Sequence, residues 1–146
     1  RSLANMFSFF VAGFLMIASA AIMHLWPASF WFEVRDVRVF DSRAGQPAVM
    51  AVDRTIRRDF RGEWLVSIRR LEHGGWVSYC TARGESNYVR DSQLPDPLAL
   101  SWWTYPSCNP LPPGRYVMRT SWVITGPSFL PDKEVQADSN IFEVTP

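Results

Sequence analysis

The sequence is poor in the residues from which reaction centres and nucleic-acid sites are usually built. Its 146 residues include two histidines and two cysteines, and Lys133 is the single lysine. So few histidines and cysteines cannot surround a zinc or copper ion. The formal net charge is +1, far below the basic excess that attracts nucleic acid. We therefore expect no nucleic-acid partner, no metal and no cofactor.

Catalytic constellations are also missing. His24 ends an apolar segment and His73 stands beside two glycines, so neither is placed to act as the base of a nucleophilic site. There is no glycine-rich phosphate loop and no dinucleotide-binding motif. Acidic pairs such as Asp36 with Asp41 are typical of solvated turns, although loops can also assemble carboxylates for acid and base work. We expect a protein that is not an enzyme.

One long apolar run dominates the N-terminal part. Residues 3–26 contain no Asp, Glu, Lys or Arg, and a helix of this length, at ~1.5 Å per residue, spans a hydrocarbon core about 30 Å thick. Pro27 ends the run. The rings of Trp26 and Trp31 are of the kind that collects at the membrane interface. We predict a transmembrane helix over residues 1–27, anchored in membrane lipid, with these two rings at the interface.

Two alternatives to the anchor deserve weight. Ala18, Ser19 and Ala20 have the small-x-small form of a signal-peptidase site, so the run can also be the apolar part of a signal peptide. A core helix of a soluble domain is disfavoured, because the uncharged run is longer than about 18 residues.

Small residues recur on one face of the predicted helix. Ala4, Ser8 and Ala12 are four residues apart, and Gly13 lies beside them, so another helix could approach closely here. Small residues are also simply common in membrane helices. We expect this face to pack against the transmembrane helix of another subunit.

Cys80 and Cys108 lie in the same polar part of the chain and do not have the CxxC spacing of metal or redox sites. A disulfide in an oxidising compartment suits them, and it would stabilise the domain by roughly 3 to 4 kcal/mol. The count of basic residues points the other way, because Arg1 stands against Arg35 and Arg38 and this favours a cytoplasmic C-terminus. We give more weight to the cysteines and expect a domain outside the cytoplasm, in a bacterial periplasm.

Residues 28–146 alternate period-two patterns with turn formers and show no sustained helical period. We predict an all-β sandwich of about seven strands, with a hairpin turn at Gly74-Gly75 and a long loop over 83–97. The predicted strands are 32–40, 48–57, 63–71, 76–82, 98–105, 115–125 and 140–144.

The prolines of CNPLPPGRY cannot donate to a sheet ladder and therefore mark a boundary before a strand. In that strand the even-numbered residues share one face, which we predict to be buried. They are Tyr116, Met118, Thr120, Trp122 and Ile124.

The run Leu111 to Tyr116 (LPPGRY) resembles the start of the sixth strand of immunoglobulin-like and fibronectin-type domains. The resemblance implies that Tyr116 is a corner tyrosine, whose hydroxyl bonds back to the preceding backbone. Trp64, in the third predicted strand, stands where such domains often bury a tryptophan. The resemblance covers roughly residues 30–146. The chain departs from antibody domains because its two cysteines do not join the second and sixth strands.

The segment LSWWTY suggests a binding surface. In a strand, Trp102 and Trp103 point to opposite faces, so one can enter the core while the other faces outward together with Tyr105. Exposed Trp and Tyr are frequent at interface hot spots and also stack on sugar rings. We take Trp103, Tyr105 and Tyr88 as the candidate surface; alternatively, the loop that carries Tyr88 covers the outward ring.

A cluster of arginines, Arg54, Arg57, Arg58 and Arg61, allows two interpretations. It could meet anionic lipid headgroups, at about 1 kcal/mol for each basic residue, or it could be a solvated strand end balanced by nearby acidic residues, which we favour. The sequence as a whole predicts a non-catalytic, membrane-anchored interaction module, an accessory or structural subunit of a larger assembly. The alternative function is carbohydrate or cell-wall binding through exposed Trp and Tyr.

Overall fold

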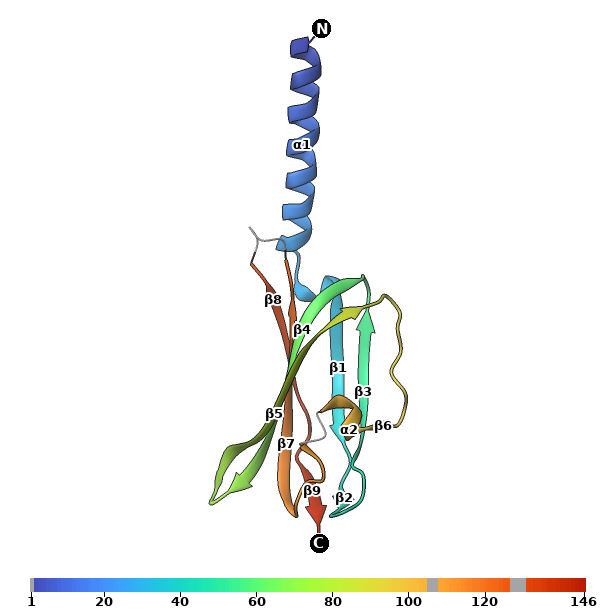
Figure 1. Cartoon of the computed structure of the whole chain (residues 1–146), viewed down its shortest axis with the longest axis vertical. Coiled ribbons are helices and arrows are strands. Elements are labelled where there is room, and N and C mark those ends of the chain that lie inside the picture. The colour runs from blue at the N-terminus through green and yellow to red at the C-terminus, as the bar shows by residue number, and fades with distance from the viewer. Residues whose placement is uncertain (1, 105–107, 127–130) are drawn as a thin grey trace.

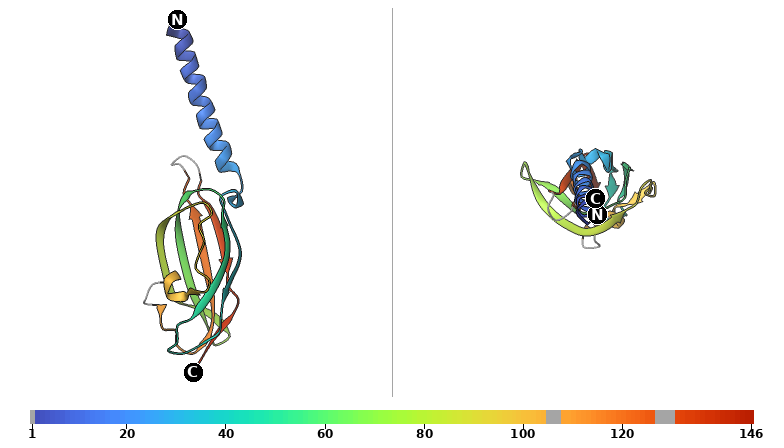
Figure 2. Two further views of the ribbon diagram at one scale, coloured as in Figure 1. Left: turned by 90° about the vertical axis from the view of Figure 1, so that its right-hand side faces the viewer. Right: turned by 90° about the horizontal axis from the view of Figure 1, so that it is seen from above.

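The computed structural model describes residues 2–104, 108–126 and 131–146. One long helix, α1 (Ser2–Leu25), is followed by a β domain with two sheets. The helix extends from one end of the β domain, so that the N- and C-termini lie at opposite ends of the molecule (Figure 1). The two sheets face each other with the core between them, as two further views show (Figure 2).

Nine strands lie in the described residues, and they form two sheets. The smaller sheet has the order β1-β3-β6, and the larger has the order β2-β9-β7-β4-β5, with β8 paired to β7. All pairs are antiparallel except β2 with β9. The bounds are β1 Phe32–Val39, β2 Ser42–Arg43, β3 Val49–Ile56, β4 Phe60–Glu72, β5 Gly75–Tyr88, β6 Leu98–Ala99, β7 Gly114–Ile124, β8 Lys133–Asp138 and β9 Phe142–Thr145.

The N-terminal helix makes no packing contact that buries it. Its segment Ser2–Ile22 is long and apolar enough to cross a membrane, with a mean hydropathy of 1.9 and none of its most apolar window buried. The hydroxyls of Ser8 and Ser19 donate to the carbonyls of Ala4 and Leu15, at 3.0 and 2.7 Å. These two hydroxyls are therefore satisfied within the helix, as a bilayer requires.

A short turn joins the helix to the β domain and directs Trp31 inward. After Pro27 the chain makes one 3-10 turn, η1 (Ala28–Phe30), and enters β1. Trp26 is 49% exposed, but Trp31 is only 6% exposed and belongs to the core. The expectation that Trp31 lies at a membrane interface is therefore wrong, because the turn points its ring into the domain.

The core is built on β7. Its even-numbered residues from Tyr116 to Ile124 are all buried, as the alternation predicted, while the odd-numbered residues between Arg115 and Val123 are mostly not. From the opposite sheet, Phe32 of β1 meets Trp122 with ring centroids 5.0 Å apart. Strands β1, β3, β4, β7 and β9 confirm the predicted strands at these positions to within a few residues.

The β4–β5 hairpin is confirmed, but its turn is one residue earlier than predicted. His73 and Gly74 have the positive φ angles, 50° and 81°, and Glu72 pairs with Gly75. The strand after the turn continues to Tyr88, although residues 83–88 were predicted to be loop. Their side chains are mostly polar and show no clear strand pattern. They form a strand because β4 pairs with β5 along the whole length of β5.

The predicted strand 98–105 is mostly wrong. Among the described residues of this segment, only Leu98 and Ala99 pair, as β6, with two residues of β3. The next four residues form one helical turn, α2 (Leu100–Trp103), and both the backbone N–H and the hydroxyl of Thr104 donate to the Leu100 carbonyl. The segment carries strand-like residues, but β3 provides no further ladder for it. The short strands β2 and β8 were not predicted.

Candidate binding pocket and surfaces

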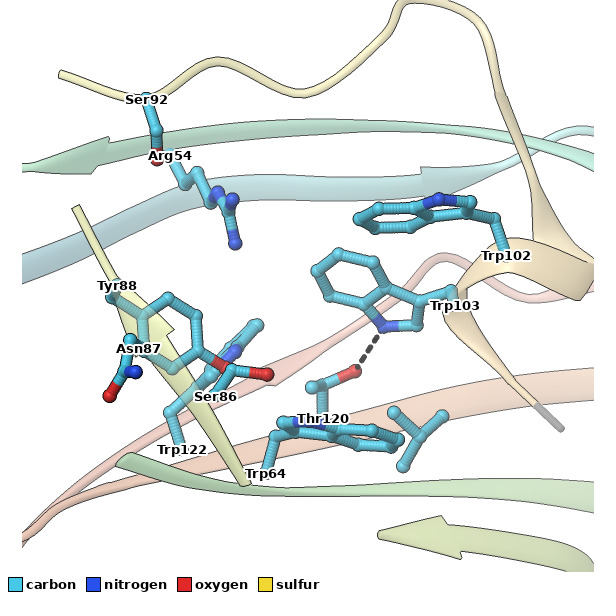
Figure 3. A pocket seen from close by; sticks show the side chains of 11 residues that line it. Arg54, Trp64, Ser86, Asn87, Tyr88, Ser92, Trp102, Trp103, Thr120 and Trp122 are labelled. Carbon is cyan, nitrogen blue, oxygen red and sulfur yellow. Dashed lines mark hydrogen bonds between the residues drawn. The ribbon is translucent and has the colours of Figure 1, made fainter. Parts of the chain in front are cut away.

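A pocket of about 320 Å³ opens between the two sheets, and five of its eleven lining residues are aromatic (Figure 3). Four tryptophans and one tyrosine surround it, together with one arginine and a few small polar residues. The lining residues are Arg54, Trp64, Val66, Ser86, Asn87, Tyr88, Ser92, Trp102, Trp103, Thr120 and Trp122. We call this the aromatic pocket.

Arg54 enters the pocket because of its place in β3. It shares the inward side of this strand with Met50 and Ile56, which are fully buried core residues. Its side chain points toward the rings of Tyr88 and Trp103 (Figure 3). An arginine thus stands at a position that the alternation of the strand reserves for an apolar side chain.

The guanidinium of Arg54 has no carboxylate partner among the described residues. Its Nε is buried and makes no hydrogen bond, and its guanidinium carbon lies 5.8 Å from the centre of the Tyr88 ring. Burial lowers the pKa of Arg54, with the nearby Tyr88 opposing this in part. The group stays charged, because an arginine pKa begins far above neutrality. The pocket therefore holds an uncompensated positive charge.

The other arginines of the cluster contrast with Arg54. Arg57 donates to Glu33 at 2.6 Å and Arg61 to Glu85 at 2.8 Å. Arg58 lies over the Phe30 ring, at 3.8 Å from its centre. The expectation of a solvated cluster balanced by acidic residues thus holds for Arg57 and Arg61, but it does not hold for Arg54.

Contacts with neighbouring core residues hold two side chains of the wall, Trp103 and Tyr88, in place. The indole Nε1 of Trp103 donates to the Thr120 hydroxyl at 3.2 Å, in a buried contact between α2 and β7. Tyr88 stacks on Phe60 with ring centroids 4.6 Å apart. Burial raises the pKa of Tyr88 to about 12, against the opposing charge of Arg54, so the phenol stays protonated at neutral pH.

The predicted aromatic surface is not a surface. Trp103 and Tyr88 are each only 8% exposed, so the expectation that they face outward is wrong, while Trp102 is 63% exposed at the edge of the pocket. Because residues 100–103 form a helical turn rather than a strand, the two tryptophans do not point to opposite faces; their rings lie 6.3 Å apart at 31°. Tyr105 lies outside the described residues.

The predicted disulfide is confirmed. Cys80 and Cys108 are bonded, with their Cα atoms 5.8 Å apart. A bulge leaves Tyr79 without a partner in β4, between the pairs that Ser78 and Cys80 make. The bulge re-aims this part of β5, so that Cys80 meets the fully buried Cys108. The bond closes a segment that carries six of the pocket residues, from Ser86 to Trp103.

Tyr116 makes the hydrogen bond expected of a corner tyrosine. Its hydroxyl donates to the Pro112 carbonyl at 2.5 Å, and the ring itself is fully buried. Trp64 is half-buried against the core, and its ring lies over Gly84, where an added Cβ would be 2.7 Å from the indole.

Ala4, Ser8, Ala12 and Gly13 lie on the free part of α1. A Cβ at Gly13 would meet no atom within 4 Å. In this single chain the small-residue face therefore has nothing packed on it, and its pairing with another helix stays a prediction.

Exposed apolar side chains lie near the tip of the β4–β5 hairpin, with Trp76 and Val77 on opposite faces of β5. Trp76, Val77 and Tyr79 are 40%, 47% and 41% exposed. The hairpin projects sideways from the β domain, near the end away from α1 (Figure 1). Sequence reasoning missed this hairpin surface, although the tight turn that projects it was predicted.

Comparison of the chain with protein-family models, curated proteins and solved structures gives no match. Within the described residues, no group of three or more His, Cys, Asp or Glu side chains is placed to hold a metal ion.

Proposed function

We propose that the protein is a membrane-anchored, non-catalytic interaction module and serves as a subunit of a larger membrane assembly. The observation that carries this proposal is α1, an apolar helix long enough to span a bilayer, none of whose most apolar window is buried by its own domain. An apolar surface of this size is stable in lipid or against other apolar helices. The short turn η1 then holds the β domain close to the membrane.

Partner contact is proposed at the hairpin surface, formed by Trp76, Val77 and Tyr79. These side chains lie near the end of the domain away from α1, where a soluble domain of a partner can reach them. Aromatic side chains that are partly exposed are frequent among interface hot spots. The small-residue face of α1 is the proposed second contact, within the membrane.

We further propose that the β domain is immunoglobulin-like. In constant-type immunoglobulin domains the first, second, fourth and fifth strands share one sheet, and the third, sixth and seventh share the other. The sheets β1-β3-β6 and β9-β7-β4 support this arrangement, and the chain departs from it at β5, which pairs with β4 instead of joining the smaller sheet. The hydrogen bond from Tyr116 to the Pro112 carbonyl also supports it.

The disulfide supports a place for the β domain outside the cytoplasm, and we propose a bacterial periplasm. Disulfides form and persist in oxidising compartments. The half-exposed ring of Trp26, at the domain end of α1, would then lie at the outer interface of the membrane.

Membrane anchoring is tested by fractionation with a carbonate wash, followed by protease protection of the β domain. The informative variant is Val11→Arg with Leu15→Arg, because an arginine at the centre of a bilayer costs about 3 kcal/mol on insertion scales. Its matched control is Leu3→Arg with Leu25→Arg, at the helix ends, where long side chains reach water. Release of the parent protein by carbonate would refute anchoring, and protection of the domain inside spheroplasts would refute the periplasmic location.

Subunit function is tested by extraction in mild detergent, purification through a C-terminal tag and mass spectrometry of what co-purifies. We expect a stoichiometric partner that is lost from Trp76→Ser and retained by Val89→Ser, a control at an exposed position directly after the far end of the same strand. A parent protein that elutes alone, or a partner that both variants retain, argues against the hairpin contact.

A further inference from the structure

We propose that the aromatic pocket binds a small organic anion in which a carboxylate is attached to a flat apolar ring. The carboxylate would bond to the Arg54 guanidinium, and the ring would lie among Trp102, Trp103 and Tyr88. This inference goes beyond the interaction module, because it concerns a small molecule and a site inside the domain. It depends neither on membrane anchoring nor on the hairpin surface.

The charge of the pocket determines the charge of the ligand. No acidic side chain lines the described wall, and the buried Nε of Arg54 makes no hydrogen bond. A buried donor without an acceptor is costly, and a fold normally avoids it or supplies a carboxylate. This fold supplies a carboxylate to neighbouring arginines such as Arg35, which donates to Asp53 at 2.7 Å. The terminal guanidinium nitrogens have no acceptor in the described fold either, and a ligand in the pocket can supply one.

The shape of the guanidinium suits a carboxylate. Arginine presents parallel N–H donors in one plane, and a carboxylate accepts two of them at once. The side chain already lies near an aromatic face, with its guanidinium carbon 5.8 Å from the Tyr88 ring centre. Its terminal nitrogens point toward the centre of the pocket (Figure 3).

The walls determine the rest of the ligand. Trp103 is buried and held by Thr120, while Trp102 is 63% exposed at the edge of the pocket, where it can flank a bound ring. Flat apolar groups pack favourably on such rings, at centroid distances of about 4.5–7 Å. Besides Arg54, the wall offers the short polar side chains of Ser86, Asn87, Ser92 and Thr120 and the phenol of Tyr88.

The volume limits the size of the ligand. About 320 Å³ is near the lower end of the range of roughly 300–1,000 Å³ that small-molecule sites occupy. The pocket therefore suits an acid of one or two rings. It is too small for an oligosaccharide or a folded peptide segment.

The test is calorimetric titration of the full chain in an uncharged detergent, with an empty-micelle titration subtracted. The probes are benzoate, its neutral isostere benzamide, and glucose. We expect benzoate to bind at one site per chain, and benzamide to bind ten- to a hundredfold more weakly, because it lacks the charge-assisted hydrogen bonds. Equal affinity for benzoate and benzamide, tighter binding of glucose, or no benzoate heat up to about 10 mM would each overturn the proposal.

Variants locate the binding. Arg54→Met should abolish benzoate binding and should not lower the melting temperature, because it removes a buried charge that has no partner. Arg38→Met, at an exposed position of β1, is the matched control and should bind like the parent. If Arg54→Met fails to fold, Trp102→Ala tests the same site at an exposed side chain, with at least tenfold weaker binding expected. Benzoate binding that survives both Arg54→Met and Trp102→Ala would refute the site.

Discussion

The bond between Cys80 and Cys108 should contribute a large part of the stability of the β domain. The perturbation is the double variant Cys80→Ala with Cys108→Ala. With a sequence separation of 28, the chain-entropy relation gives about 12 cal/mol/K for the restriction of the unfolded chain. At 25 °C this is about 3.6 kcal/mol of unfolding free energy. Domains of this size are stable by only roughly 5–15 kcal/mol, so the loss should be easy to measure.

The assay is urea unfolding of the full chain in an uncharged detergent, followed by tryptophan fluorescence. At a slope of about 2 kcal/mol/M, the double variant should unfold at roughly 2 M less urea than the parent. Reduction of the parent with a thiol is the matched control. It should lower the parent to the level of the variant and leave the variant unchanged.

Removal of the disulfide should also affect the aromatic pocket. The disulfide closes the segment that brings Tyr88, Trp102 and Trp103 to the pocket, and without it this segment is free to move away from β3 and β7. An unfolding free energy of the double variant within about 1 kcal/mol of the parent would refute the reasoning. Such a result would mean that the loop is already restricted in the unfolded chain.

Three further changes test separate features of the fold. Tyr116→Phe should lower the unfolding free energy by about 1 kcal/mol, because it loses the hydrogen bond to the Pro112 carbonyl. Tyr79→Phe, at a partly exposed ring, is the control and should not lower it. Equal effects of the two changes would contradict the role of Tyr116 as a corner tyrosine. Gly84→Ala should destabilise the domain by about 1–2 kcal/mol, because the added Cβ would lie 2.7 Å from the indole of Trp64. Gly75→Ala is the control and should be nearly neutral, because its Cβ would meet no atom closer than 3.8 Å. Thermal melts of both variants measure the difference. Because Tyr88 has a pKa of about 12 when folded and near 10 when unfolded, its contribution is complete below pH 10 and is lost as the pH rises through 12. Tyr88→Phe should flatten the fall in unfolding free energy over this window, and an unchanged slope would contradict the burial of the phenol.

Predictions from the sequence succeeded where one local pattern was enough. In β7 the alternation runs over the whole strand, and so the buried face from Tyr116 to Ile124 could be read from it. The disulfide was predictable because the chain has only two cysteines to pair. The apolar run of α1 contains no charged residue, and it was recognised from composition and length alone.

Predictions failed where a segment depended on a neighbour far away in the sequence. Residues 83–88 have the polar composition of a loop, but they form a strand because β4 offers them a free edge. Residues 100–103 have the aromatic composition of a strand, but β3 pairs with only two residues of this region. Propensity cannot supply or remove a hydrogen-bonding partner, and here the partner was decisive.

The sequence by itself determined that the chain has an apolar helix, a β-rich remainder, one cystine and no metal or phosphate motif, because composition and short-range periodicity carry this information. Only the tertiary structure decided which aromatic rings are buried and where the charge of Arg54 lies. In the sequence this arginine is one of a polar cluster. The register between β1 and β3, and the crossing of the chain from β5 to β6, place it between the sheets beside Tyr88 and Trp103. Burial and charge separation are properties of distances between remote residues, and a sequence read alone contains no such distances.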